Sequence, residues 1–353
     1  MHSRYFDNAA TCPVDPRVRD AMLPFLAEDC GNASSIHSFG RKAAAEVEEA
    51  RAAIASLLGA EDPSEIVFTS GATEANNWVA QRAGIQAVSP FEHSSMLESA
   101  GAAGAGMLEN EGYWISPLEA DAPIAVMHVN NETGAIITAP TGGLIHRDLT
   151  QTVGKVTLPQ EPFATASFSA HKIYGPKGIG GLWIRGIGPL DAPLLYGGEH
   201  EQGLRAGTLN VPGIVGLGEA ARISFGEQER DYMHAQDLRG VVLEELRASV
   251  DWHENDHTNQ SPFILSVSFL NLEGQTLVEE IDVRGFAISS GAACSSGSTD
   301  PSHVLTALGL ENEWIRGTIR ISFGRTNTRE SARDLGLAIV ETVESVRKLR
   351  LKS

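Results

Sequence analysis

Cysteine is scarce in this 353-residue chain, and basic side chains are outnumbered by acidic ones. The cysteines are Cys12, Cys30 and Cys294, an odd and low count that argues against a disulfide framework and favours a reducing, cytoplasmic compartment. The chain has 27 lysines and arginines against 45 aspartates and glutamates, a net charge of −18. Such a surface repels nucleic acid and anionic membranes, so neither is an expected partner. The excess of acid either only aids solubility or suits a basic protein partner.

Other features are also missing. No stretch approaches the roughly 18 apolar residues of a membrane span. The opening MHSRYFDNAATCPVD lacks the basic segment and apolar core of a signal peptide. Cysteine and histidine show no metal-ligand spacing, so no metal site is expected. We also find no internal repeats. These absences leave a globular protein, for which 353 residues suffice to bury a sizeable core.

Short apolar runs alternate with amphipathic helices through the first two thirds of the chain. Residues 40–60 form an alanine-rich helix that Gly59 is placed to end, and residues 65–70 and 122–131 are apolar strands. Two further strands, at 164–175 and 178–185, flank a glycine-rich loop. The alternation predicts an α/β fold with a mostly parallel central sheet flanked by helices on both faces.

The pattern changes near Val211. A long helical stretch over 213–249 precedes apolar strands at 261–270 and 316–325, and an amphipathic helix at 328–349 closes the chain. This order is typical of a smaller α+β domain. We therefore expect a large domain over 12–212. The small domain would comprise 1–11 and 213–353 and carry a mobile cysteine loop at about 289–300.

Two segments contain groups that could hold a carbonyl compound with a phosphate. In SFSAHKIYGPKGIGG (167–181), Lys172 ends an apolar strand, where a partly desolvated amine can form a Schiff base. In TSGATEANN (69–77), the backbone amides of Ala72 and Thr73 begin a helix and could bind an anion. Taken singly, each has a simpler explanation: a solvated surface lysine and an ordinary capped helix.

Two other positions could assist such chemistry. Asp148, in LIHRDLTQ (144–151), could pair with a pyridine nitrogen and keep it protonated, and Gln151 could bond a ring hydroxyl. Cys294 lies among serine, glycine and alanine in SSGAACSSGSTDPSHV (289–304), the composition of an exposed loop. A thiol there could act as a nucleophile if its pKa is lowered. The alternatives are a helix cap and an inert loop cysteine.

Several long motifs occur together and in order, and they resemble one family. They are DNAATCPVDP, GNASSIHSFGRKA, TSGATEANN, HVNNETG, SAHKIYGPKG, GGEHEQGLRAGT and SSGAACSSGS. The chain resembles the cysteine desulfurases of the NifS/IscS type, in the class V aminotransferase group of fold-type I pyridoxal-phosphate enzymes. The likeness runs from about Tyr5 to Arg329.

The resemblance implies a role for each matching residue toward pyridoxal 5′-phosphate. Lys172 would bond the cofactor covalently, Asp148 would pair with its ring nitrogen, and Gln151 would contact its phenolic oxygen. His93 would stack on the ring and shuttle protons, and Asn131 would contact the ring oxygen or the substrate. The phosphate would be held by Ala72, Thr73, Ser169 and His171.

The resemblance also implies a substrate, a partner and a reaction. Arg320 would bind the carboxylate of L-cysteine through two bonds, and Thr208 would reach the phosphate of a neighbouring subunit in a homodimer. Lys172 would remove the Cα proton, and Cys294 would take the sulfur as a persulfide while L-alanine leaves. The sulfur would then pass to an acceptor protein, either an iron–sulfur scaffold or a sulfur shuttle, for cluster assembly or other thio-cofactors. Alternatives are a selenocysteine lyase, another class V enzyme, or an inactive scaffold in iron–sulfur assembly.

The chain is short for this family, and the shortfall is local. Between NNETG (130–134) and HRDLTQ (146–151), Pro140 and the pair Gly142–Gly143 exclude the crossover helix that relatives carry. Either the strand order changes here or a bare loop makes the crossing. We expect an apolar patch on the uncovered sheet face, shielded by a partner. The segment before His93 is also trimmed, and the sequence offers no physical account of Arg147.

Overall fold

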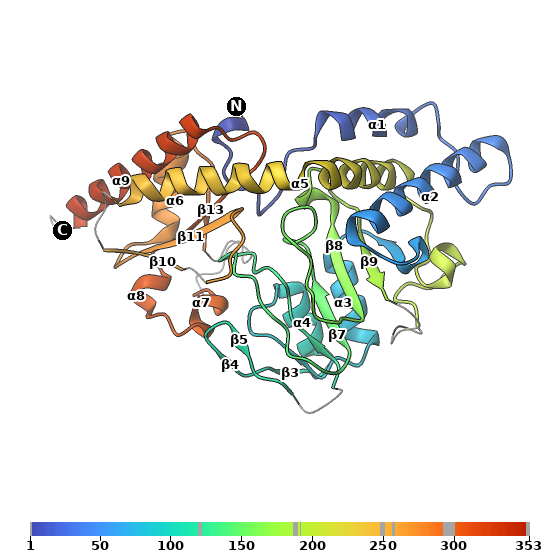
Figure 1. Cartoon of the computed structure of the whole chain (residues 1–353), viewed down its shortest axis with the longest axis horizontal. Helices are drawn as coiled ribbons and strands as arrows, with labels where there is room; N and C mark the ends of the chain where they lie inside the picture. Colours follow the sequence, from blue (N-terminus) through green and yellow to red (C-terminus); the bar gives the residue numbers. More distant parts are fainter. Residues whose placement is uncertain are drawn as a thin grey trace.

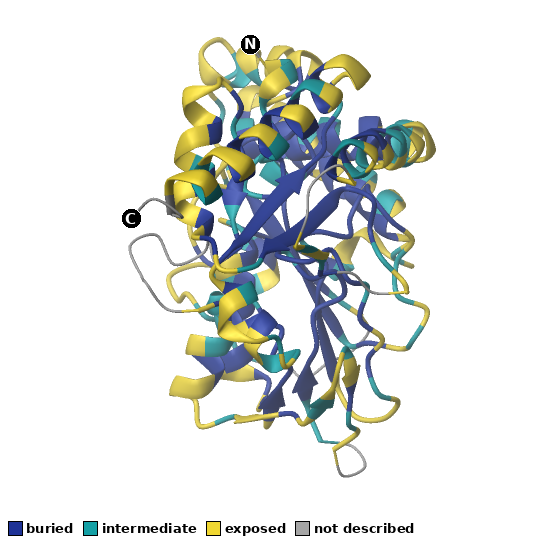
Figure 2. Cartoon of the chain, turned by 90° about the vertical axis from the view of Figure 1, so that its left-hand side faces the viewer, coloured by how far each residue is buried: buried dark blue, intermediate teal, exposed yellow. Residues whose placement is uncertain are grey.

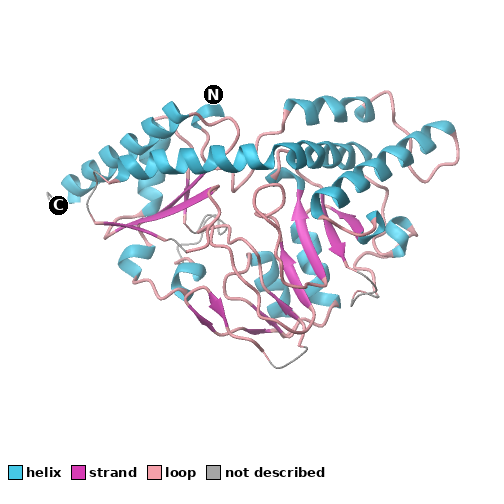
Figure 3. Ribbon diagram, viewed as in Figure 1, coloured by secondary structure: helices cyan, strands magenta, loops and turns pink. Residues whose placement is uncertain are grey.

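Two β-sheets lie side by side beneath a long helix, α5 (Val211–Leu246), in the computed structural model (Figures 1 and 3). The structure describes residues 2–118, 122–185, 190, 192–247, 251–255, 258–291 and 301–350. The larger sheet has the order β1 (Ile66–Thr69), β9 (Gly180–Ile184), β8 (Thr165–Ser169), β7 (Ile145–Asp148), β6 (Ile124–Ala125), β2 (Ala87–Val88) and β3 (Gly106–Met107).

The larger sheet is mostly parallel. Within the described strands, β9 runs antiparallel to both of its neighbours, whereas β8, β7, β6, β2 and β3 run parallel. This agrees with the predicted α/β class. Figure 2 shows most strands as buried, with many exposed residues on the surrounding helices, whereas the edge strand β3 is exposed.

Helices cover both faces of the larger sheet, as the alternation predicts. Along β1, Ile66 and Phe68 pack with α2 (Ser38–Leu58) and the first half of α5, while Val67 points to the other face. That face is covered by α3 (Ala72–Arg82) and α4 (Ser94–Ala102). Since successive strand residues point to opposite faces and both faces are covered, Ile66, Val67 and Phe68 are all apolar. A further helix, α1 (Pro16–Leu26), packs on α5.

Helix α2 shows how the sequence sets an element's limits. Ala43, Val47, Ala50 and Ile54 recur every three or four residues and are buried. The helix ends at Gly59, which has φ of 66° and donates its backbone N–H back to the last turn. A residue without Cβ adopts this left-handed conformation most easily, so the predicted stop at Gly59 is confirmed.

The smaller sheet is antiparallel, in the order β10 (Trp252–Glu254), β11 (Ile264–Phe269), β13 (Thr318–Ser322) and β12 (Ser289–Ser290). It packs against α6 (Gly274–Val283), α9 (Arg329–Arg350) and the second half of α5. Helix α5 thus contributes to both cores, and the domain boundary at 212/213 remains a prediction. The shorter elements are η1 (His2–Arg4), η2 (Pro63–Glu65), β4 (Asn110–Glu111), β5 (Trp114–Ile115), η3 (Ala170–Lys172), η4 (His200–Gly203), α7 (His303–Ala307) and α8 (Asn312–Ile315).

A loop without a helix connects the parallel strands β6 and β7, so the second of the two predicted alternatives holds. The strand predicted over 122–131 is regular only at Ile124–Ala125. Backbone bonds to β7 continue from Val126 and His128, and then the turn at 130–134 folds the chain back. The trimmed segment before His93 retains the two-residue strand β2.

The loop itself covers the sheet face that the missing helix would occupy. Ile137 and Ala139 are buried in the core beneath α5, which differs from the expected bare apolar patch. Arg147, in β7, points to the same face, and its Nη2 donates to Ile137 O at 2.7 Å. A helix would have bonded that carbonyl itself. Arg147 therefore anchors the loop, which supplies the physical account that the sequence did not.

Candidate functional site

A cavity of about 430 Å³ opens where β7 and β8 end. In a parallel sheet, the carboxyl ends of strands are the usual place for a ligand. The smaller sheet contributes Ser289 and Arg320, and the N-terminal segment contributes Asp7 to Ala10. The lining residues are Asp7, Ala9, Ala10, Ala72, Thr73, His93, Ser95, Met127, Asn131, Asp148, Thr150, Gln151, Ser169, His171, Lys172, Ser289 and Arg320.

Lys172 lies at the end of η3, directly after β8, and its amine reaches the cavity. The Nζ atom donates to Ala9 O at 2.6 Å and to Ala10 O at 2.7 Å. The residue is half-buried, so the amine is partly desolvated. A partly desolvated amine held by neutral carbonyls is suited to react with a carbonyl group.

Asp148 ends β7 with a buried side chain. Its Oδ2 accepts from Asn76 Nδ2 at 2.9 Å, and its Oδ1 accepts from the backbone N–H of Thr150 at 2.8 Å. Asn76 is fixed in turn by Ser167 Oγ, which donates to Asn76 Oδ1 at 2.6 Å, and by His146. Burial lowers the pKa of His146 to about 4, so this neighbour is neutral at pH 7. The carboxylate is thus held rigidly at the cavity wall.

The first turn of α3 offers an anion site next to these groups. Gly71 precedes the helix and provides no side-chain cap, although Ser169 Oγ accepts from the Ala72 N–H at 2.8 Å. A second cavity of about 430 Å³ adjoins here and shares Ala72, Thr73, Ser169 and His171 with the first; Lys177 also lines it. The positive end of the helix dipole, the Ser169 hydroxyl and the Lys177 cation together favour a phosphate or carboxylate here.

Two histidines line the cavity as neutral rings. His93 precedes α4, and its Nδ1 accepts from the backbone N–H of Ser95 at 3.1 Å. Burial lowers the pKa of His93, so the imidazole can accept a proton at pH 7. His171 Nδ1 lies 3.1 Å from Thr11 Oγ1, and burial, aided by the charge of Lys172, lowers the pKa of His171 to about 3.

Arg320 brings a buried cation from β13. Its Nη2 donates to Asp7 Oδ1 at 3.0 Å, and its Nη1 donates to Asn131 O at 3.0 Å. Ser289 Oγ donates to the same Asp7 oxygen at 2.8 Å. A guanidinium has five N–H bonds, so these two contacts orient it and leave donors for a carboxylate. The role of Asp7 was missed from the sequence, although the residue opens the DNAAT motif.

The structure brings ten of the twelve proposed site residues into this cavity: Ala72, Thr73, His93, Asn131, Asp148, Gln151, Ser169, His171, Lys172 and Arg320. Thr208 is exposed and does not line it. Cys294 lies outside the described residues, five positions after Ser289. In the described ranges, no group of three histidine, cysteine or acidic side chains could hold a metal ion. Nor does any helix there have the length and hydropathy to cross a bilayer.

Glu92, adjacent to His93, predicts a pH-dependent stability. Burial raises the pKa of Glu92 to about 7, although Ser89 Oγ donates to its Oε1 at 2.6 Å. The folded-state pKa of this carboxyl thus lies above its unfolded value. Its contribution to the free energy of unfolding is therefore complete below about pH 4.5 and is lost as the pH rises through 7. Wild-type protein should therefore lose up to about 3 kcal/mol relative to Glu92→Gln between pH 5 and 8.5.

Thermal unfolding of both proteins across this pH range checks the prediction, with the exposed substitution Glu28→Gln as a control. Parallel curves of unfolding temperature against pH for wild type and Glu92→Gln would show that the carboxyl does not titrate with an elevated pKa.

Comparisons with known proteins agree on one family. The family model "Aminotransferase class-V" matches residues 4–103 and 118–335. Cysteine desulfurase IscS of Vibrio vulnificus (strain CMCP6) is 38% identical, over 98% of this chain and 93% of the relative. The IscS of Neisseria meningitidis serogroup C (strain 053442) is 39% identical with the same coverage. The Vibrio alignment runs over 387 residues, more than this chain has, so the relative carries segments that are missing here.

Comparison with solved structures also finds similar proteins. A NifS-like protein superposes with a TM-score of 0.86 at 33% identity, covering 97% of this chain and 99% of that one. SspA in complex with cysteine superposes with a TM-score of 0.75 at 30% identity, covering 92% of this chain and all of the other.

Proposed function

The chain belongs to the class-V aminotransferase family, and from that premise we propose that it is a pyridoxal-phosphate-dependent cysteine desulfurase. It would convert L-cysteine to L-alanine and a persulfide on Cys294. The observation that carries the proposal is the meeting of Lys172, Asp148, Arg320 and the start of α3 in one cavity. The similarity to IscS proteins along nearly the whole chain supports it.

The residues present fit pyridoxal 5′-phosphate. The cavity supplies an amine for its aldehyde, a buried carboxylate for its ring nitrogen, and an uncapped helix start for its phosphate. When bound, this cofactor supplies an electron sink that weakens the bonds at Cα and Cβ of an amino acid. Ala72, Thr73, Ser169 and His171 would hold the phosphate. Gln151 would face the phenolic oxygen, and His93 the ring.

Lys172 and Asp148 have complementary tasks. Asp148, fixed by Asn76, keeps a proton on the ring nitrogen. In its neutral form, the Lys172 amine would take the proton from Cα of the substrate, because it lies in the same cavity. His93 is neutral and can relay a proton, since burial lowers its pKa.

Arg320 binds the substrate. Asp7 and the Asn131 carbonyl hold its guanidinium, and the remaining N–H donors fit the planar carboxylate of L-cysteine. Lys172 lines the same cavity as Arg320. The side chain of Asn131 would contact the ring oxygen or the substrate.

Cys294 takes the sulfur. Five residues of chain separate Cys294 from Ser289, which lines the cavity, and even a fully extended backbone of that length spans at most about 18 Å. Its thiolate bonds to the substrate sulfur while the Cβ–S bond breaks, and the carbon fragment takes up protons and leaves as L-alanine. No external oxidant is needed, because the electron pair of the Cβ–S bond stays with the carbon fragment, which is reduced to L-alanine as the sulfur is oxidised to the persulfide level. The persulfide would then pass to an acceptor protein, for iron–sulfur cluster assembly or other thio-cofactors, in the cytoplasm.

A homodimer would complete the site. Thr208 is exposed and lies outside its own chain's cavity, as a residue serving a partner subunit's phosphate must. Large apolar side chains are also exposed elsewhere in the described surface, including Ile36, Phe39 and Tyr196. Exposed apolar groups of this size are consistent with a covered interface.

The proposal is tested by comparing two cysteine substitutions. Cys294→Ala should lose at least about 99% of the L-alanine released from L-cysteine, because the sulfur then lacks its acceptor. Cys30→Ala, at an exposed cysteine, should leave the rate unchanged. Equal full activity of both variants, measured with L-cysteine and the bound cofactor, would exclude a desulfurase that works through Cys294.

A further inference from the structure

Lys155 is a buried lysine that the proposed mechanism leaves without a task. It follows β7 in a tight turn, in which Thr152 and Val153 donate backbone bonds to Leu149 O, and Lys155 and Val156 donate to Thr152 O. Gly154 completes the turn with φ of 67°, and a Cβ there would lie 2.8 Å from Ser224 Cβ of α5. The turn is thus pressed against α5, which fixes the direction of the Lys155 side chain.

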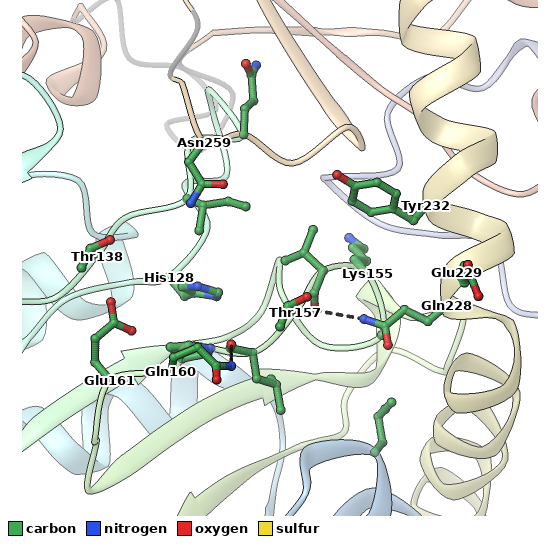
Figure 4. A pocket seen from close by; sticks show the side chains of 17 residues that line it. His128, Thr138, Lys155, Thr157, Gln160, Glu161, Gln228, Glu229, Tyr232 and Asn259 are labelled. Atoms are coloured by element: carbon green, nitrogen blue, oxygen red, sulfur yellow. Dashed lines mark hydrogen bonds between the residues drawn. The ribbon is translucent and has the colours of Figure 1, made fainter.

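Lys155 separates two cavities. One is the site described above, which Gln151 lines. The other has about 830 Å³ and lies beside the loop that replaces the crossover helix (Figure 4). Figure 4 shows Lys155 at the wall of this outer cavity, with Gln228 and Tyr232 of α5 on the same side. Despite this position, Lys155 is only 6% exposed.

The hydrogen bond of the Lys155 amine points to the inner site. Lys155 Nζ donates to Gln151 Oε1 at 2.9 Å, and no carboxylate of the described residues forms an ion pair with it. Gln151 Nε2 then donates to Ala9 O at 2.9 Å, the carbonyl that also accepts from Lys172. Burying a lysine amine without a carboxylate partner is costly, and burial lowers the pKa of Lys155.

We propose that Lys155 is a positioning residue that fixes the amide of Gln151 so that its N–H₂ end faces the cofactor's phenolic oxygen. The amine of Lys155 donates to Gln151 Oε1, so it holds the oxygen end of the amide. One N–H of Gln151 is taken by Ala9 O, and the other is left for the ring oxygen. The inference rests on the proposed function, because it assumes that pyridoxal phosphate occupies the cavity.

The test measures cofactor affinity rather than turnover. Apoenzyme is titrated with pyridoxal 5′-phosphate and with 3-deoxypyridoxal 5′-phosphate, which lacks only the ring oxygen. Lys155→Met should weaken binding of the first ligand about tenfold, the size of one buried hydrogen bond, and leave binding of the second unchanged. Lys42→Met, at an exposed lysine, serves as the control for charge removal. Lys155→Gln retains an N–H donor and should recover part of the difference between the ligands.

A double-mutant cycle tests whether Lys155 acts on cofactor affinity through Gln151. If Lys155 acts through Gln151, then Lys155→Met should have no further effect on affinity in a Gln151→Leu background. Equal losses for both ligands in Lys155→Met and Lys155→Gln, or additive losses in the cycle, would overturn the positioning role. Wild-type enzyme that binds the cofactor and shows the predicted cycle, yet releases no alanine from L-cysteine, would overturn the proposed function alone.

Discussion

Replacing Lys172 with alanine should reduce alanine release from L-cysteine by about 10⁴-fold, the upper range for a positioned general base. In the proposed mechanism, the Lys172 amine both bonds the cofactor and reaches Cα. Ala9 O and Ala10 O hold this amine at the cavity wall. The variant should also lose the absorbance of a lysine-bound cofactor. The phosphate contacts at α3 should still hold part of the cofactor non-covalently.

The matched control is Lys348→Ala, at an exposed position of α9. It removes the same charge far from the cavity and should keep full activity. Steady-state rates and absorbance spectra of the three proteins separate the two outcomes. Wild-type rates in Lys172→Ala would show that this amine takes no part in the mechanism.

Asp148→Asn should lower the turnover number about 10³-fold, or roughly 4 kcal/mol in activation free energy. An amide keeps the shape of the side chain but cannot hold a proton on the ring nitrogen. It can still accept from the Thr150 N–H, so the local turn is preserved. The contact with Asn76 would be lost, at a cost of about 1 kcal/mol in stability.

The two possible roles of Asp148 give different results. If the carboxylate only caps the turn after β7, then Asp148→Asn loses little activity, because the amide caps as well. If it tunes the cofactor, turnover falls while the unfolding temperature changes by only a few degrees. Asp20→Asn, at an exposed carboxylate of α1, is the control for charge removal. Unchanged turnover in Asp148→Asn would assign the residue to the turn.

Much of the site could be predicted because its residues are carried by short, local motifs. Lys172 follows β8, and Ala72 and Thr73 follow β1. Both strands pair antiparallel with β9, which lies between them, so their carboxyl ends lie at the same edge of the sheet. The length and end of α2 follow equally from spacing and Gly59. Helix limits and strand ends of this kind are set by residues close together in the sequence, so they can be predicted from it.

Other features depend on contacts between distant segments. Asp7 pairs with Arg320 across 313 positions, and nothing in either segment specifies the other. The loop between β6 and β7 could be predicted, because Pro140 and the two glycines exclude a helix there. Its anchoring by Arg147 could not, because the sequence does not show which face of β7 this residue occupies. Lys155 was overlooked because a lysine in a turn is usually solvated, whereas here α5 covers it.

The most direct measurement follows the sulfur atom. Cofactor-loaded wild-type protein is mixed with L-cysteine, and alanine release and the mass of each cysteine-containing peptide are recorded together. The account predicts one added sulfur on Cys294, none on Cys12 or Cys30, and alanine in equal amount during the first turnover. Alanine formed without a persulfide on Cys294, or no alanine from an enzyme that has bound its cofactor, would contradict it.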